Sequence, residues 1–168
     1  MSLAIRDELP ADAAAIDAVT RAAFAQAPHT SHTEEHIVNA LRRAGALTIS
    51  LVAALDDAVV GHVAVSPVSI SDGAAGWYGL GPISVLPAHQ RRGIGASLMH
   101  AALAALRLRA ASGCVLLGDP DYYRRFGFRA TADLVLPGAP PGYFLAVPLD
   151  DSAPHGIVTY HPAFGATR

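Results

Sequence analysis

The sequence predicts an α/β fold (an α+β arrangement with one mixed β-sheet flanked by helices) for this chain of 168 residues. Segments that look like strands alternate with segments of helical periodicity, in the order β-α-α-β-β-β-α-β-α, followed by a β-rich tail. Some neighbouring strands are close enough for hairpins, and others are separated by a helix, so antiparallel and parallel pairs should both occur. Hydrophobic residues make up 52% of the chain, which is enough to fill a core.

The first half of the chain predicts two helices and three strands. In order, we expect a strand at residues 3–6, helices at 10–26 and 31–45, and strands at 47–55 and 58–70. Pro10 opens the first helix, and Ser31 with Glu34 has the spacing of a capping box for the second. Gly45 ends that helix. Asp56 and Asp57 are the turn of a hairpin.

The second half predicts a further strand, a long helix and a β-rich tail. We expect a strand at residues 77–86, a helix that runs to about residue 111 and ends at Gly113, and a strand at 114–117. A short helix at 121–126 closes at Gly127, and strands follow at 129–136, 143–148 and 156–160. There is neither a repeat nor a linker, so residues 1–168 should form one domain, with its signature region at 77–128.

Composition and charge exclude several classes of function. The net charge of −2 does not favour nucleic acid as a partner. The chain has no lysine, which excludes a Walker-type phosphate loop and Schiff-base catalysis. The N-terminus does not resemble a signal peptide, and arginines interrupt the alanine-rich segment 101–111, so no membrane partner is expected. With Cys114 as the single cysteine, we expect a cytoplasmic protein.

A glycine-rich segment joins the strand at 77–86 to the long helix and predicts an anion site. It consists of Gln90, Arg91, Arg92, Gly93, Ile94, Gly95, Ala96 and Ser97. The first turn of a helix has unpaired N–H groups and partial positive charge, and glycines let a pyrophosphate approach closely. A dinucleotide-binding fingerprint would need a third glycine where Leu98 stands, so the Rossmann alternative fails. An ordinary strand-to-helix turn is the structural alternative.

The strand before this segment contains Gly79-Leu80-Gly81-Pro82. Proline cannot donate to a strand ladder, so a proline in a central strand indicates a bulge or a place where strands separate. A loop that divides two short strands is the alternative.

Together, these two segments resemble motif A of the GNAT acetyltransferases, Gln/Arg-x-x-Gly-x-Gly/Ala, and the strand that leads into it. The resemblance implies a splayed sheet, acetyl-CoA as co-substrate and no metal. It assigns the pyrophosphate to the glycine-rich segment and the pantetheine arm to the backbone at Ile83, Ser84 and Val85. One N–H group of that strand would polarise the thioester carbonyl.

The segment from Asp119 to Phe128 is similar to GNAT motif B, in which a tyrosine lies four residues before a Gly-Phe pair. Tyr123 has that position, and the resemblance makes it the catalytic acid that protonates the departing thiolate. Tyr122 is the weaker candidate. Arg124 and Arg125 could contact the coenzyme's phosphates or be solvated.

The resemblance implies direct transfer of the acetyl group to a primary amine of a small molecule or peptide. Glu34, Glu35 or His36 could act as the base, or could simply form a solvated helix start. The alternative function is a non-catalytic acyl-CoA sensor of the same fold. A homodimer is possible through the β-rich tail from Tyr143.

One competing pattern indicates a metal. His32, Glu35 and His36 fit His-x-x-Glu-His, with the two histidines one helical turn apart. Capping already accounts for this segment, and no further carboxylate ligand can be identified, so we expect no metal site.

Overall fold

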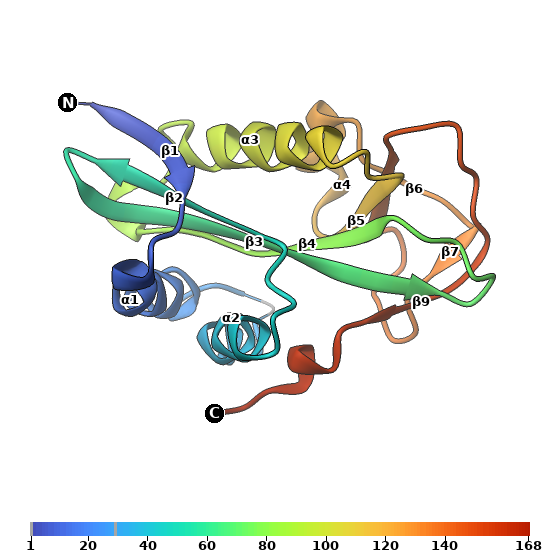
Figure 1. Cartoon of the computed structure of the whole chain (residues 1–168), viewed down its shortest axis with the longest axis horizontal. Coiled ribbons are helices and arrows are strands. Elements are labelled where there is room, and N and C mark those ends of the chain that lie inside the picture. The colour runs from blue at the N-terminus through green and yellow to red at the C-terminus, as the bar shows by residue number, and fades with distance from the viewer. Residues whose placement is uncertain (1, 29) are drawn as a thin grey trace.

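A computed structural model describes residues 2–28 and 30–168 as a central β-sheet with helices on both faces (Figure 1). The strands are β1 (Leu3–Asp7), β2 (Ile49–Leu55), β3 (Ala58–Ile70), β4 (Trp77–Val85), β5 (Gly113–Leu117), β6 (Arg129–Ala130), β7 (Leu134–Val135), β8 (Phe144–Pro148) and β9 (Gly156–Tyr160). The α-helices are α1 (Ala13–Phe24), α2 (Glu34–Arg43), α3 (Ile94–Leu108) and α4 (Pro120–Tyr123). Short 3-10 helices are η1 (Pro10–Asp12), η2 (Pro87–His89), η3 (Arg124–Phe126) and η4 (Pro162–Gly165). The predicted mixed α/β architecture is confirmed.

The main sheet has the strand order β1–β2–β3–β4–β5–β8–β6. Its pairs are antiparallel except for β4 and β5, which run parallel through the α3 crossover. The far end of β3 pairs with β9, and β9 pairs in parallel with β7. Asp56 and Asp57 have φ values of 49° and 71° and form the predicted two-residue turn of the β2–β3 hairpin.

Each face of the sheet carries its own helices (Figure 1). Leu98 and Met99 of α3 are fully buried on one face, in the largest hydrophobic cluster. On the other face, α1 and α2 pack together, and Ile16 and Val38 bury themselves against Val52. Because each helix shows one apolar stripe to the sheet, the sheet fills the middle of a three-layer structure. In the described part of the chain, no helix is long and apolar enough to cross a membrane.

Two helix boundaries differ from the sequence prediction. The second helix begins at Glu34, not directly after Ser31, because the Ser31 hydroxyl pairs with the Thr33 hydroxyl at 2.6 Å and does not cap a helical N–H. The long helix ends at Leu108, because Ala110 has a φ of 56°.

Gly113 does not end the helix but opens β5. The Trp77 ring lies so close to Gly113 that a Cβ there would be 2.3 Å from Trp77 Cη2. The glycine therefore permits close packing of β5 against the start of β4.

The tail also departs from its prediction. The strand expected at 129–136 is two separate short strands, because β6 pairs with β8 while β7 pairs with β9.

The central strands β4 and β5 separate, as the glycines and proline of β4 predict. Their parallel pairing ends at Gly79, opposite Val115. On the β3 side, the register shifts by one residue at Gly81-Pro82, since Val63 pairs with Ile83 and Val65 pairs with Leu80. The rest of β4 therefore has a partner on the β3 side only, and its other edge is open.

Candidate active site

A pocket of about 460 Å³ lies between the open edge of β4, the start of α3 and the short helix α4. It is lined by Ile83, Ser84, Val85, His89, Gln90, Arg91, Gly93, Gly95, Ala96, Met99, Tyr122, Tyr123 and Arg125. The pocket thus brings together the glycine-rich segment, the interrupted strand and the tyrosine helix, which are separate in the sequence.

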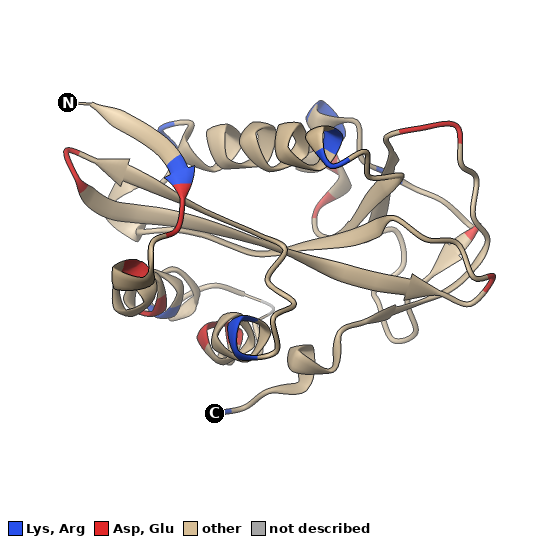
Figure 2. Cartoon of the chain, viewed as in Figure 1, with Lys and Arg blue, Asp and Glu red and all other residues tan. Residues whose placement is uncertain are grey.

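The first turn of α3 supplies unpaired N–H groups to this pocket. The helical bonds of this turn begin with Ser97, whose N–H donates to the carbonyl of Gly93 at 3.0 Å, so the N–H groups of Ile94, Gly95 and Ala96 precede the first helical donor and have no acceptor within the helix. Figure 2 shows basic stretches at the loop before α3 and at the α4–η3 segment. Backbone donors, helix dipole and arginines together favour an anion here.

The two glycines of this turn have different roles. Gly93 caps the helix with a φ of 81°, and a Cβ there would meet nothing within 4 Å. Gly95 has an ordinary helical backbone, and its missing Cβ would lie 3.9 Å from the Tyr122 hydroxyl and 4.0 Å from Val85 Cγ2. The backbone conformation at Gly93 therefore requires glycine, whereas the missing side chain of Gly95 leaves space in the pocket between Tyr122 and Val85.

The open edge of β4 directs backbone groups of alternate residues into the pocket. The N–H of Leu86 donates to Val60 of β3 at 2.8 Å, so by the alternation of a strand the N–H groups of Ile83 and Val85 face away from β3, toward the splay. Gln90 Nε2 donates to the Val85 carbonyl at 3.0 Å and thereby joins the glycine-rich segment to the strand. The N–H groups of Ile83 and Val85 can pair with an extended ligand.

Tyr123 projects from α4 into the same pocket. Its ring packs on Gly118, where a Cβ would lie 2.3 Å from Tyr123 Cε2. It also lies edge-on to the Tyr122 ring, with the two centroids 4.9 Å apart. Burial, with a smaller contribution from Tyr122, raises the pKa of the Tyr123 phenol, so the phenol keeps its proton at neutral pH. A protonated phenol beside the splay can donate to a leaving group.

Most of the predicted site residues line the pocket, but three do not. Ile94 is buried in the hydrophobic core, the Arg92 side chain is exposed, and Ser97 is not among the residues that line the pocket. Ser84 contributes only backbone, because its hydroxyl lies 3.4 Å from the Thr20 hydroxyl on the α1 face.

Four further residues line the pocket, namely His89, Met99, Tyr122 and Arg125. No pattern in the sequence predicted His89 or Met99, whereas Tyr122 was the weaker candidate for the acid and Arg125 was one of two arginines that could contact the phosphates or be solvated. Arg125 Nε donates to the Tyr122 carbonyl at 2.8 Å, and its guanidinium lies 4.3 Å from the centre of the Tyr122 ring. The sequence signal for this pair was the Tyr-Tyr-Arg-Arg run itself, which leaves open which members face inward until the helix register is known.

The histidine pattern does not form a metal site in the described residues. His32 lies before α2 with a φ of 57°, so it is not one helical turn from His36 as the pattern assumed. His36 lies 3.4 Å from the Glu35 carboxylate. Within residues 2–28 and 30–168, no group of three or more His, Cys, Asp or Glu side chains could hold a metal ion.

The helix N-terminus, the open strand edge and the buried phenol have the arrangement that the sequence resemblance implied for an acyl-transfer site. The chain belongs to the GNAT acetyltransferase family. A family model described as "Acetyltransferase (GNAT) domain" matches residues 47–130. The Escherichia coli (strain K12) protein named "Uncharacterized N-acetyltransferase YhbS" is 35% identical over 167 residues, which cover 95% of this chain and 97% of the relative.

Two solved structures agree with this assignment. A GNAT family acetyltransferase from Brucella melitensis in complex with acetyl-CoA is 50% identical, with a TM-score of 0.87 over 97% of this chain and 98% of the other. The structure of Escherichia coli YhbS in complex with CoA is 35% identical, also with a TM-score of 0.87, over 99% of this chain and 96% of the other. The predicted GNAT fold and acetyltransferase class are confirmed.

Proposed function

We propose that this protein transfers the acetyl group of acetyl-CoA directly to a primary amine, and that residues 1–168 form one domain for this purpose. One observation carries the proposal: a single pocket joins the α3 N-terminus, the open edge of β4 and the Tyr123 phenol. The acetyl-CoA complex of the Brucella melitensis structure and the CoA complex of YhbS support the choice of coenzyme. A cytoplasmic location and a homodimer stay predictions.

The pocket residues fit a CoA thioester. The N–H groups at the start of α3 and Arg91 would hold the pyrophosphate, and Gly95 leaves room for it where a side chain would enter the pocket. The N–H groups of Ile83 and Val85 would pair with the pantetheine arm as a further strand would.

The coenzyme, when bound, would supply the acetyl group as an activated thioester. In direct transfer, the neutral amine nitrogen bonds to the carbonyl carbon, the carbon–sulfur bond breaks, and the nitrogen loses a proton to water. A backbone N–H of the splayed strand would stabilise the charge that develops on the carbonyl oxygen. Tyr123 would hold its proton until sulfur departs and then donate it, and the phenolate would recover a proton from water.

Calorimetric titration with acetyl-CoA, combined with Tyr123→Phe, tests this function. We expect saturable binding by both proteins and a loss of turnover of about 10²-fold or more in the variant, because only the proton donor is removed. Release of CoA thiol in the presence of amines measures the turnover. Tyr143→Phe is the control, because Tyr143 is exposed and lies outside the pocket.

Three results would change the proposal. A folded sample that fails to bind acetyl-CoA would contradict it outright. Equal turnover of Tyr123→Phe and the wild type would remove Tyr123 as the acid. Tight binding without acetylation of any amine would favour the non-catalytic acyl-CoA sensor.

A further inference from the structure

A second pocket is lined by residues of α1 and α2, of the strands β4, β5 and β9, and of η4. Figure 1 shows α1 and α2 on the opposite face of the sheet from α3. The volume of this pocket is about 390 Å³, a size suited to a small molecule. It is lined by Phe24, Glu34, Ile37, Leu80, Gly81, Pro82, Leu117, Leu136, Pro137, Tyr160 and Phe164.

The two pockets have neighbouring residues of β4 in their linings. The second pocket includes Pro82 and the first includes Ile83, which is the next residue of the same strand. Leu117, at the end of β5, borders the second pocket where β4 and β5 have separated. A molecule in the second pocket would therefore lie beside the place where β4 and β5 separate.

The wall of the second pocket is almost entirely apolar. Its described lining contains no arginine or histidine, so no cation is present to receive an acidic group. Its polar side chains are Glu34 and Tyr160, and burial raises the pKa of the Tyr160 phenol, which is therefore neutral. The pocket thus combines an apolar wall with one carboxylate.

One carboxylate oxygen of Glu34 accepts several hydrogen bonds, and the other accepts none from the described residues. Glu34 Oε2 accepts hydrogen bonds from the Thr30 hydroxyl at 2.6 Å and from the N–H and hydroxyl of Ser31, each at 3.2 Å. Glu34 Oε1 is buried and has no partner among the described residues, and the whole side chain is only 9% exposed. A buried polar oxygen without a partner is costly, so this oxygen is suited to a donor that the ligand brings.

The charge state of Glu34 strengthens this point. Burial raises its pKa, but the hydrogen bonds from Thr30 and Ser31 outweigh burial, and the net shift is downward. Glu34 is therefore ionised at neutral pH. Neither Glu35 nor His36, the other two candidate bases, lines either pocket.

We propose that the second pocket is the acceptor site and takes a small primary monoamine with an apolar or aromatic body, whose ammonium group pairs with Glu34 Oε1. This inference rests on the proposed function. The apolar body would contact Phe24, Ile37 and Phe164. Because a second ammonium or a carboxylate would have no partner there, diamines and amino acids would be poor acceptors. The amine gives up its extra proton to water before it attacks, and Glu34 acts by binding and orienting it.

A comparison of acceptors with the wild-type protein and Glu34→Gln tests the inference. The probes are 2-phenylethylamine, putrescine, phenylalanine and a short peptide with a free N-terminus, each assayed by CoA release. We expect 2-phenylethylamine to have the highest kcat/KM, and Glu34→Gln to lower that value by at least about tenfold, mainly through KM. Glu35→Gln is the matched control, because Glu35 is equally buried but lies outside the pocket.

Calorimetry on the same samples separates this inference from the proposed function. Failure to bind acetyl-CoA would overturn both. Normal coenzyme binding with putrescine, phenylalanine or the peptide as the best acceptor, or with no acceptor acetylated, would overturn the acceptor assignment. An unchanged KM in Glu34→Gln would do the same. If Glu34→Gln fails to fold, the ranking of acceptors by the wild type still decides.

Discussion

Gly93 and Gly95 stand two residues apart at the start of α3, and the structure requires each for a different reason. For Gly95→Val we expect acetyl-CoA binding to weaken at least about tenfold, because the new side chain enters the pocket between Tyr122 and Val85. For Gly93→Ala we expect a loss of about 1 kcal/mol in the free energy of unfolding, because alanine is strained at a φ of 81°. Calorimetry and urea denaturation measure the two effects.

The matched pair of variants distinguishes a steric role from a conformational one. Gly165→Ala is a neutral control, because its Cβ would meet nothing within 4 Å and its backbone does not require glycine. If Gly95→Val bound acetyl-CoA as the wild type does, the first turn of α3 would not be the coenzyme site.

The glycine-rich pattern predicted Gly93 and Gly95, and the resemblance to GNAT motif B predicted Tyr123, but neither gave the direction of every neighbouring side chain. Ile94 lies between the two glycines, yet its side chain points into the core. Ser84 points toward Thr20 of α1 because successive strand residues face opposite sides of the sheet. Which face of β4 meets the coenzyme depends on packing of α1 and α3, and local sequence carries little of that information.

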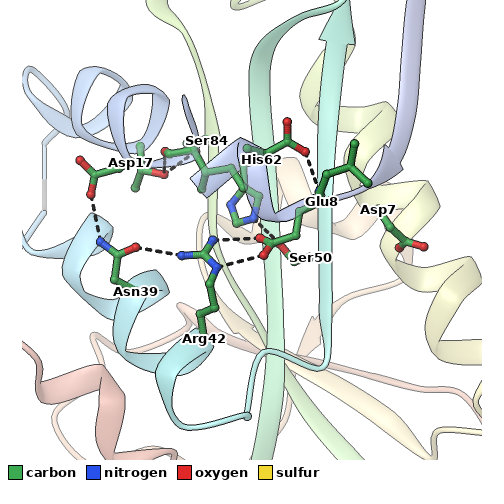
Figure 3. A network of polar contacts seen from close by, with 12 residues as sticks. Asp7, Glu8, Asp17, Asn39, Arg42, Ser50, His62 and Ser84 are labelled. Atoms are coloured by element: carbon green, nitrogen blue, oxygen red, sulfur yellow. Dashed lines mark hydrogen bonds and ion pairs between the residues drawn. The ribbon is translucent and has the colours of Figure 1, made fainter. Parts of the chain in front are cut away.

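Besides the apolar contacts that pack α2 on the sheet, one arginine joins this helix to neighbouring elements through hydrogen bonds (Figure 3). Arg42 donates from Nε and Nη2 to the two oxygens of Glu8, each at 2.9 Å, and from Nη1 to Asn39 Oδ1 at 2.9 Å. The Ser50 hydroxyl donates to Glu8 and also contacts His62 Nε2, at 2.7 Å in the second case. The network links the C-terminal half of α2 to β2 and β3 and thereby helps to fix the helix that carries Glu34.

Arg42→Leu should therefore destabilise the protein by about 1–3 kcal/mol, because it leaves the half-buried Glu8 carboxylate without its charged partner. Urea denaturation measures the loss. Arg43→Leu is the control, since Arg43 is exposed on the same helix turn and should change stability little. Equal effects of the two substitutions would show that the Arg42–Glu8 pair does not hold α2.

Long periodic elements were predictable, whereas their ends and the irregular tail were not. The turn residues Asp56 and Asp57 defined where β2 ends and β3 begins, and Pro82 marked the splay, because each constrains its own backbone. The prediction that Gly113 ends a helix was wrong. Glycine is required there because the Trp77 ring leaves no room for a side chain, and Trp77 is distant in sequence. The Arg42–Glu8 network likewise joins residues 34 positions apart and left no local signal.

At the scale of the whole molecule, the sheet separates two chemical environments. The face with α3 and α4 presents backbone donors and arginines, which suit a phosphate-bearing coenzyme. The pocket on the side of α1 and α2 is lined by apolar side chains, the Tyr160 phenol and, among the described residues, the single carboxylate of Glu34, and this lining would suit an apolar amine. The two pockets have neighbouring residues of β4 in their linings, next to the place where β4 and β5 separate. Under the proposed function, this splay would let the coenzyme and the amine approach each other from the two faces of the sheet.

Stability of the whole molecule should depend on pH through His62, which is fully buried in β3. Desolvation lowers its pKa from 6.5 to about 4, and the attraction of Glu8 only partly opposes this. The unfolded chain therefore binds a proton below pH 6.5, whereas the folded protein does not until about pH 4. The free energy of unfolding should be greatest above pH 6.5 and fall by about 3 kcal/mol in total as the pH drops to 4.

Urea denaturation across this pH range checks the expectation. Glu8 and Glu34 have pKa values that the fold lowers from 4.5, so their contributions are lost only at more acidic pH, and the window from 6.5 to 4.5 reports His62. His62→Gln should flatten the dependence of the free energy of unfolding on pH in that window. In the wild type, only the unfolded chain binds a proton at His62 there, and the substitution removes this difference between the two states. His155→Gln, at a mostly exposed histidine, should leave the slope unchanged. An unaltered slope in His62→Gln would mean that another group controls the acid sensitivity of the fold.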